Sequence, residues 1–83
     1  TTALREQVAK LAKDIDPCLT IHDLRITAGP SHTNVLFDVM VPYGFRLTDS
    51  QVVSQLRQGV EALSPKYYAV IQVDHSYVEN REK

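Results

Sequence analysis

The sequence predicts an α+β fold, an open sandwich in which two helices lie on one face of a three-stranded mixed sheet. Two segments carry apolar residues at helical spacing, and three segments carry them at every second position. Proline, glycine and polar residues separate the five segments, whose order is helix, strand, strand, helix, strand. At 83 residues the chain has room for one domain, which is expected to span 1–83.

The first helix is predicted over 3–15, where one side of the segment is apolar. Its apolar residues recur at spacings of four, three and four, and they are Leu4, Val8, Leu11 and Ile15. Asp16-Pro17 ends the helix, because the residue before a proline is pushed out of the helical region and proline cannot continue the hydrogen-bond ladder. A strand is expected to follow this corner.

A β-hairpin is predicted over 19–41. The first strand, 19–28, changes its apolar phase at His22-Asp23, which predicts a bulge or bend there. Gly29-Pro30-Ser31-His32 provides the turn. One side of the second strand, 34–41, consists of Val35, Phe37, Val39 and Val41. The other side is apolar except at Asn34 and Asp38, so both sides are expected to be covered to some extent.

The second helix is predicted to begin after Thr48, because Thr48 and Gln51 have the Thr-x-x-Gln form of a capping box. The apolar stripe of this helix consists of Val52, Val53, Leu56, Val60 and Leu63. Ser64-Pro65 ends the helix for the same reason that Asp16-Pro17 ends the first one.

The last strand is predicted over 67–74, with successive residues on opposite faces. Tyr67, Ala69, Ile71 and Val73 share one face, and Tyr68, Val70, Gln72 and Asp74 share the other. The charged tail, 79–83, is expected to fray. The resulting order of elements is that of a ferredoxin-like open sandwich without its first strand.

Charge and composition exclude several classes of function. Nine Lys and Arg against ten Asp and Glu give a formal charge of −1, which disfavours nucleic acid and anionic membrane surfaces as partners. No stretch approaches the roughly 20 apolar residues that cross a bilayer, and no apolar signal segment stands at the N-terminus, so a soluble protein is expected. The single cysteine, Cys18, cannot form an intramolecular disulfide, and a reducing compartment fits.

The size and topology of the chain predict self-association. Ordering each residue costs about 1.5 kcal/mol, and a chain this short buries little apolar area to offset that cost. A three-stranded sheet with helices on one face also leaves edges and the other face poorly covered. Two copies whose sheets meet face to face would solve both problems, so a homodimer is expected.

Polar residues on neighbouring strands are candidates for binding a divalent metal ion. The candidates are His22, Asp38, Gln72, Asp74 and His75. Asp38 stands in an otherwise nearly apolar strand, where a carboxylate has to be solvated, paired or bound to a metal. Gln72 and Asp74 are two residues apart, so their oxygen atoms project from the same face of a strand. The alternative is that these residues are solvated strand ends, and His75 is a weaker candidate because it has the opposite phase.

Two strings of residues carry a resemblance to a known family. The first is Ile21-His22-Asp23-Leu24-Arg25, and the second, which follows Gly29-Pro30, is Val35-Leu36-Phe37-Asp38-Val39-Met40-Val41-Pro42. With these strings the sequence resembles the cytoplasmic C-terminal domain of cation diffusion facilitator transporters. The similarity extends over almost the whole chain, to the closing strand at 70–74, and the predicted order of elements agrees with it. The resemblance implies a regulatory domain on the cytoplasmic side of the cell membrane, a homodimer attached to the transmembrane domain of the same transporter. It also implies that divalent cations bind near the subunit interface.

The candidate residues match the pattern of that family in part. His22 matches the histidine of the first strand, whereas Asp38 stands where a histidine is usual. Gln72-Val73-Asp74 stands where the last strand commonly has His-x-Asp. The resemblance implies zinc, but a donor set with few imidazoles also suits manganese. The alternative is a metal-independent structural dimerisation module.

An enzyme is not expected. A small phosphatase of the acylphosphatase type would need an anion-binding loop, and Arg25 and Asn34 are scattered strand residues without a glycine-rich loop beside them. RNA recognition on such a sheet would need exposed aromatic residues in a basic surround, and the sequence has no such pattern.

Overall fold

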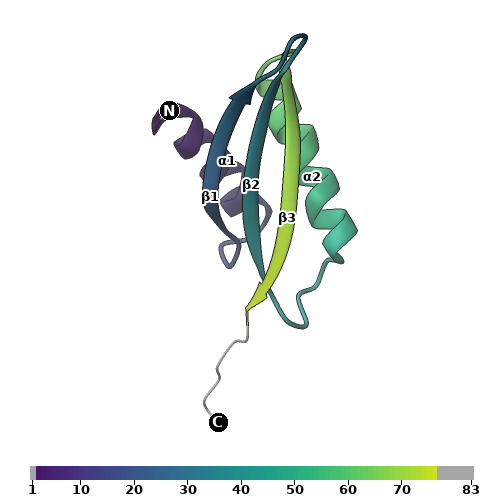
Figure 1. Cartoon of the computed structure of the whole chain (residues 1–83). Coiled ribbons are helices and arrows are strands. Elements are labelled where there is room, and N and C mark those ends of the chain that lie inside the picture. The colour runs from purple at the N-terminus through teal and green to yellow at the C-terminus, as the bar shows by residue number, and fades with distance from the viewer. Residues whose placement is uncertain (1, 77–83) are drawn as a thin grey trace.

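The five elements occur in the predicted order. The computed structural model describes residues 2–76, which form α1 (Thr2–Ile15), β1 (Thr20–Ala28), β2 (Thr33–Pro42), α2 (Asp49–Leu63) and β3 (Tyr67–Ser76) (Figure 1). The charged tail at 79–83 lies outside the described residues. No helix between residues 2 and 76 is long and apolar enough to span a membrane.

The sheet is mixed, as predicted, with β2 at its centre. β1 pairs with β2 in antiparallel orientation, and β3 pairs with the other edge of β2 in parallel orientation. Because parallel neighbours need a crossover connection, α2 joins β2 to β3 across one face of the sheet. α1 packs on β1, α2 packs on β3, and the two helices contact each other, so both lie on the same face (Figure 1). The α+β open sandwich is confirmed.

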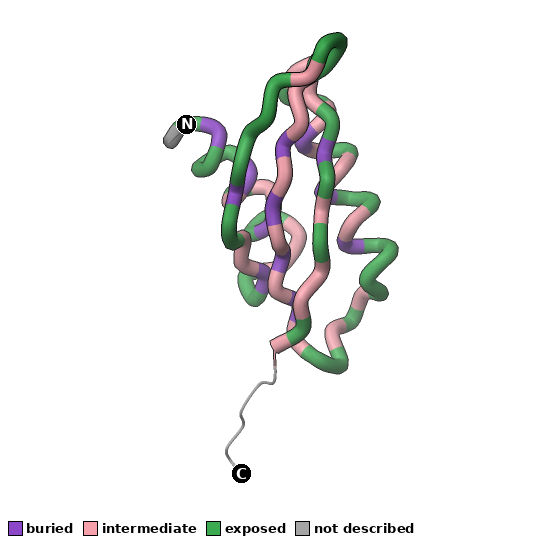
Figure 2. The backbone as a smooth tube through the Cα atoms, in the orientation of Figure 1, coloured by how far each residue is buried: buried purple, intermediate pink, exposed green. Residues whose placement is uncertain are grey.

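The core lies between the two helices and the face of the sheet that they cover. Along β2, buried residues alternate with half-buried ones, as the tube in Figure 2 shows. The buried residues of the core are Leu4, Val8, Ala12, Leu19, Leu24, Val35, Phe37, Val39, Val41, Val52, Leu56, Val60 and Ala69. The apolar stripe predicted for α1 therefore packs in this core. The stripe predicted for α2 is confirmed in part: Val52, Leu56 and Val60 are buried, whereas Leu63 at the end of the helix is 37% exposed and Val53 lines a hollow on its outer side.

A bulge in β1 accounts for the predicted change of phase. His22 pairs with Asp38 and Arg25 pairs with Leu36, so two residues of β1, at 23 and 24, stand opposite one residue of β2. Asp23 has a φ of 55°, a left-handed conformation that aspartate adopts more readily than most residues. Because Asp38 and Leu36 share a face, the bulge brings His22 and Arg25 to that same face, although they are three positions apart.

The loop between β2 and α2 is held at Thr48, next to α2, and at Arg46 within the loop. The Thr48 hydroxyl accepts a hydrogen bond from the Gln51 N–H at 3.1 Å, and the Gln51 side chain accepts one from the Thr48 N–H at 2.9 Å. The predicted capping box is therefore present. Arg46 donates to the Asp16 carboxylate at 3.2 Å and to the Ile15 carbonyl at 2.7 Å, which ties the loop to the end of α1.

The outer edge of β3 is partly occupied by side chains of α2. The Ala69 N–H donates to the Glu61 carboxylate at 3.4 Å, and the Arg57 guanidinium donates to the Ala69 carbonyl at 3.5 Å. Arg57 also lies 6.0 Å from the centre of the Tyr68 ring. These contacts shield the backbone of an edge strand, which would otherwise be available to pair with another chain.

Candidate functional site

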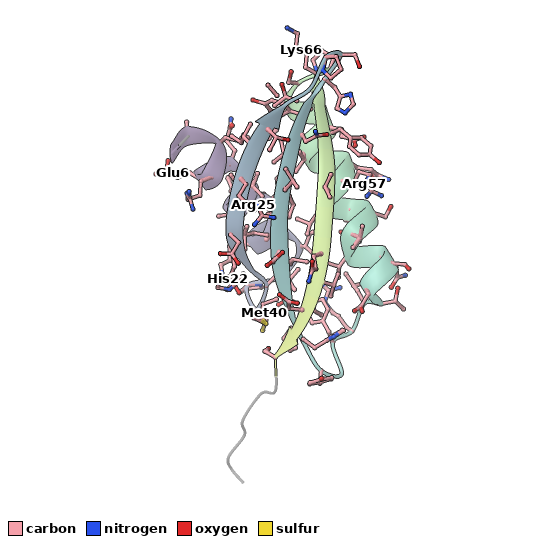
Figure 3. All side chains as sticks on the ribbon, viewed as in Figure 1. Glu6, His22, Arg25, Met40, Arg57 and Lys66 are labelled. Carbon is pink, nitrogen blue, oxygen red and sulfur yellow. The ribbon has the colours of Figure 1, made fainter. Side chains whose placement is uncertain are left out.

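The face of the sheet that carries no helix, called here the open face, holds most of the candidate residues. Its members follow from the strand register and from the alternation along each strand. They are Thr20, His22, Arg25 and Thr27 of β1, Asn34, Leu36, Asp38 and Met40 of β2, and Tyr68, Val70, Gln72 and Asp74 of β3. Figure 3 shows His22, Arg25 and Met40 on these strands.

Three candidate metal ligands form one row across the open face. His22 of β1 pairs with Asp38 of β2, and Asp38 pairs with Gln72 of β3. Asp74 lies in the next row, where it pairs with Met40. Asp38 and Asp74 are half-buried, whereas His22 and Gln72 are exposed. The structure therefore brings four of the five predicted ligands to one face.

The fifth candidate, His75, lies on the helix-covered face. β3 continues to Ser76, so alternation along the strand sends His75 to the side opposite Asp74. There the Nε2 atom of His75 lies 2.9 Å from a carboxylate oxygen of Asp49, and its ring stacks on Tyr43 with 5.2 Å between the ring centres. His75 therefore joins the end of β3 to the start of α2, away from the other four candidates.

The described residues of one copy do not assemble a metal site. Within residues 2–76, no three His, Cys, Asp or Glu side chains are grouped closely enough to hold a metal ion. Strands lie about 4.8 Å apart, so the row from His22 to Gln72 spans about 10 Å. A structural zinc site normally has four nitrogen or sulfur ligands around one ion. The Nε2 atom of His22, moreover, lies 3.0 Å from the Thr20 hydroxyl.

Arg25 is a charged residue of this face that the sequence did not single out as part of a site. It lines a hollow of about 350 Å³ together with Asp38, Gln72 and the apolar side chains of the neighbouring strands. Within residues 2–76 neither Arg25 nor Asp38 forms a salt bridge or a side-chain hydrogen bond. The signal that could have found Arg25 is the phase change at His22-Asp23, because a two-for-one bulge places the residue three positions after His22 on the same face.

A larger hollow, of about 540 Å³, lies elsewhere on the molecule. It follows one side of α2 and is lined by Asp49, Ser50, Val53, Ser54, Arg57, Gln58 and Glu61. The buried Nε atom of Arg57 has no hydrogen-bond partner there. None of the four candidate ligands of the open face borders this hollow.

Two polar side chains outside the open face, Asp16 and His32, form hydrogen bonds at turns of the chain. The backbone N–H of Cys18 donates to the Asp16 carboxylate at 2.9 Å, and this hydrogen bond, with the Arg46 guanidinium, lowers the pKa of Asp16 below its ordinary value of 3.8. His32, at the hairpin turn, is exposed and lies 3.1 Å from the Asn34 side-chain oxygen. The hydrogen bonds of Asp16 and His32 therefore account for the positions of these two side chains.

Comparison with known proteins identifies relatives by fold. Neither the protein-family models nor the curated proteins contain a match to this sequence. A solved structure described as the metal-bound C-terminal domain of the CzcD transporter from Thermotoga maritima matches with a TM-score of 0.71 and 14% identity, over 98% of this chain and 94% of that one. A structure on the mode of action of CzrB, assigned as a zinc transporter, matches with a TM-score of 0.64 and 17% identity, over 86% and 94%. The shared fold confirms the predicted αββαβ class.

Proposed function

We propose that this chain is a homodimerising cytoplasmic regulatory domain of a divalent-metal efflux transporter of the cation diffusion facilitator family. One observation carries the proposal: the fold matches the metal-bound C-terminal domain of a transporter over nearly the whole of both chains. The string Ile21-His22-Asp23-Leu24-Arg25, which resembles that family, forms the bulged strand of the open face. The proposal assigns no catalytic step, and its partners are a second copy, the transmembrane domain of the same transporter and divalent cations.

The open face is the surface proposed for the second copy. It exposes Tyr68 at 47% and Val70 at 41%. Leu36, which pairs with Val70, and Met40, which lies four residues further along β2, are only half-buried. Burying these apolar side chains against a partner favours association, because apolar surface is removed from water. A two-fold axis through this face would place the same patch on both sides of the interface.

Metal binding, in this proposal, draws on both copies. His22, Asp38 and Asp74, with Gln72 as a neutral oxygen donor, would hold the ion, and a second copy doubles the number of donors at the interface. A bound divalent cation supplies positive charge between carboxylates that otherwise repel one another across the axis. The donors are mostly oxygen atoms, which suits manganese better than a structural zinc site.

Scattering and calorimetry test this proposal. Zn²⁺ or Mn²⁺ at saturating concentration is expected to change the small-angle scattering of the dimer, because the distance between the copies changes. His22→Ala and Asp74→Ala are expected to lose the heat of metal binding, whereas His32→Ala, a matched control at the hairpin turn, retains it. A monomer at all concentrations, with or without either ion, would refute the proposal.

A metal-independent dimerisation module is the second candidate function. It is favoured by the lack of any three grouped His, Cys, Asp or Glu side chains among residues 2–76. In that case the dimer would form, but neither ion would change its scattering, and no heat of metal binding would be measured for the unmodified chain.

A further inference from the structure

Three charged groups of the open face, Arg25, Asp38 and Asp74, form no salt bridge or side-chain hydrogen bond within residues 2–76. The salt bridges of residues 2–76 join Lys10 to Asp14, Arg46 to Asp16 and His75 to Asp49. Arg25 and Asp38 form none, although both line the same hollow.

A covered open face would make unpaired charges costly. Removing a carboxylate or a guanidinium from water without a counter-charge is strongly unfavourable, and Asp38 is already half-buried in the centre of the sheet. A partner that covers this face avoids this cost if it brings a positive group to Asp38 and a negative group to Arg25. A purely apolar partner surface does not meet this condition.

A second copy of the chain meets that condition without any further component. In a two-fold interface each contact occurs twice, so a contact from Arg25 of one copy to Asp38 of the other implies the reciprocal contact. Arg25 is the one Lys or Arg among the open-face residues defined above, so it is the cation that this face can offer to a carboxylate. Its planar guanidinium can hold a carboxylate through two parallel hydrogen bonds.

We propose that reciprocal ion pairs between Arg25 of one copy and Asp38 of the other close the dimer without a metal ion. This inference rests on the proposed function in using the open face as the dimer interface, and it changes one assignment: Asp38 pairs with Arg25, so that His22, Gln72 and Asp74 remain as donors to the ion. In this arrangement Arg25 is the counter-cation of Asp38. Within residues 2–76 of one copy, no three His, Cys, Asp or Glu side chains are grouped closely enough to hold a metal ion there instead. A divalent ion then adjusts an interface that already exists, through the other donors of the face.

Charge reversal tests this assignment. The 83-residue chain and the variants Arg25→Asp and Asp38→Arg are compared by sedimentation equilibrium in the presence of EDTA, together with a double variant that carries both changes. Each single variant places two like charges at each contact, so its dimer is expected to dissociate at least about tenfold more readily than the unmodified dimer. The double variant restores opposite charges and is expected to recover most of that loss. Arg5→Asp, the same change on an exposed residue of α1, is expected to have no effect.

The outcomes separate this inference from the proposed function. An unmodified chain that dimerises only after Zn²⁺ or Mn²⁺ is added overturns the metal-free closure but supports the metal-dependent dimer. Single variants that dimerise as well as the unmodified chain, or a double variant that does not recover, also overturn the inference, while the dimer itself stands. Recovery in the double variant further shows that the loss in the single variants comes from mismatched charges and not from either substitution by itself. A chain that is monomeric under every condition removes both proposals.

Discussion

The two faces of the sheet differ in what covers them. On β2, Phe37 and its neighbours on one face are at most 1% exposed, because they belong to one buried cluster with residues of both helices. The alternate residues of the same strand, among them Leu36 and Asp38, are half-buried with no helix above them. One face is therefore covered by the chain's own helices, whereas residues 2–76 place no helix over the other.

The difference is also one of composition. The helix-covered face has no buried polar or charged residue among the described residues. The open face mixes apolar side chains with His22, Arg25, Asp38 and Asp74. Interfaces between proteins combine an apolar centre with charged and polar groups that fix the orientation of the partner, whereas the core of a domain excludes such groups. Substitutions on the helix-covered face are therefore expected to change the folding equilibrium, and substitutions on the open face are expected to change the association of two copies.

The largest expected effect is on the helix-covered face. Phe37→Ala removes a fully buried ring and leaves a cavity, so we expect a loss of about 3–5 kcal/mol in the free energy of unfolding. Leu36→Ala, one residue away on the open face, is expected to cost less than about 1.5 kcal/mol in dilute protein, because its side chain is already partly in water. Urea denaturation measures both values. Equal losses would show that the two faces do not differ in this way.

A smaller effect is expected on the open face, and on association instead of folding. Val70→Asp adds a charge to an exposed apolar residue of the proposed interface, so the dimer is expected to weaken about tenfold or more. The stability of the dissociated chain is expected to change by about 0.5 kcal/mol or less. Sedimentation equilibrium and urea denaturation separate the two. Gln58→Asp, on the exposed side of α2, is the matched control, and a dimer unaffected by Val70→Asp would place the interface elsewhere.

Much of the fold could be predicted from the sequence because local patterns determine it. The apolar spacing from Leu4 to Ile15, the proline stops and the Thr48 cap each act within one element, and all were confirmed. The bulge was predicted as well, since the apolar phase of β1 changes at His22-Asp23. These features depend on residues close together in the chain.

The candidate site was predictable only in part, because it depends on register. Alternation placed Gln72 and Asp74 on one face, but pairing with β2 decided that Gln72, and not Asp74, joins the row of His22 and Asp38. The end of β3 decided the position of His75, and the sequence does not mark that end sharply. The grouping of Arg25 with Asp38 needed both the bulge and the pairing of two strands. A single strand pattern contains neither piece of information.

The capping box of α2 gives a third, moderate prediction for the helix-covered side. Thr48→Ala removes the acceptor of the Gln51 N–H, so we expect a loss of about 1 kcal/mol in the free energy of unfolding. Thr48→Ser keeps a hydroxyl and is expected to retain most of that stability. Because α2 lies behind the sheet, neither change should alter self-association once the variants are folded. Weaker association of Thr48→Ala at temperatures where it is fully folded would contradict a separation of the two faces.

The smallest effect concerns pH and the corner after α1. The pKa of Asp16 is lowered in the folded chain, chiefly by the Cys18 N–H and then by Arg46, so ionised Asp16 stabilises the fold at pH values above 3.8, its ordinary pKa. This contribution is lost as the pH falls through the lowered pKa of the folded chain, where the carboxylate takes up a proton. Asp16→Asn should therefore be less stable than the unmodified chain near neutral pH, and the difference should shrink as the solution becomes more acidic.

Urea denaturation of both chains from about pH 7 down to about pH 2 measures this difference. Asp14→Asn is the control, because its carboxylate pairs with Lys10 on the exposed surface of the same helix, where ion pairs contribute little. A difference between Asp16→Asn and the unmodified chain that stays constant over the whole pH range would mean that the charge of Asp16 is not what matters. The hydrogen bond to Cys18, which asparagine can also accept, would not explain such a constant loss, so the cause would have to lie in packing around Arg46.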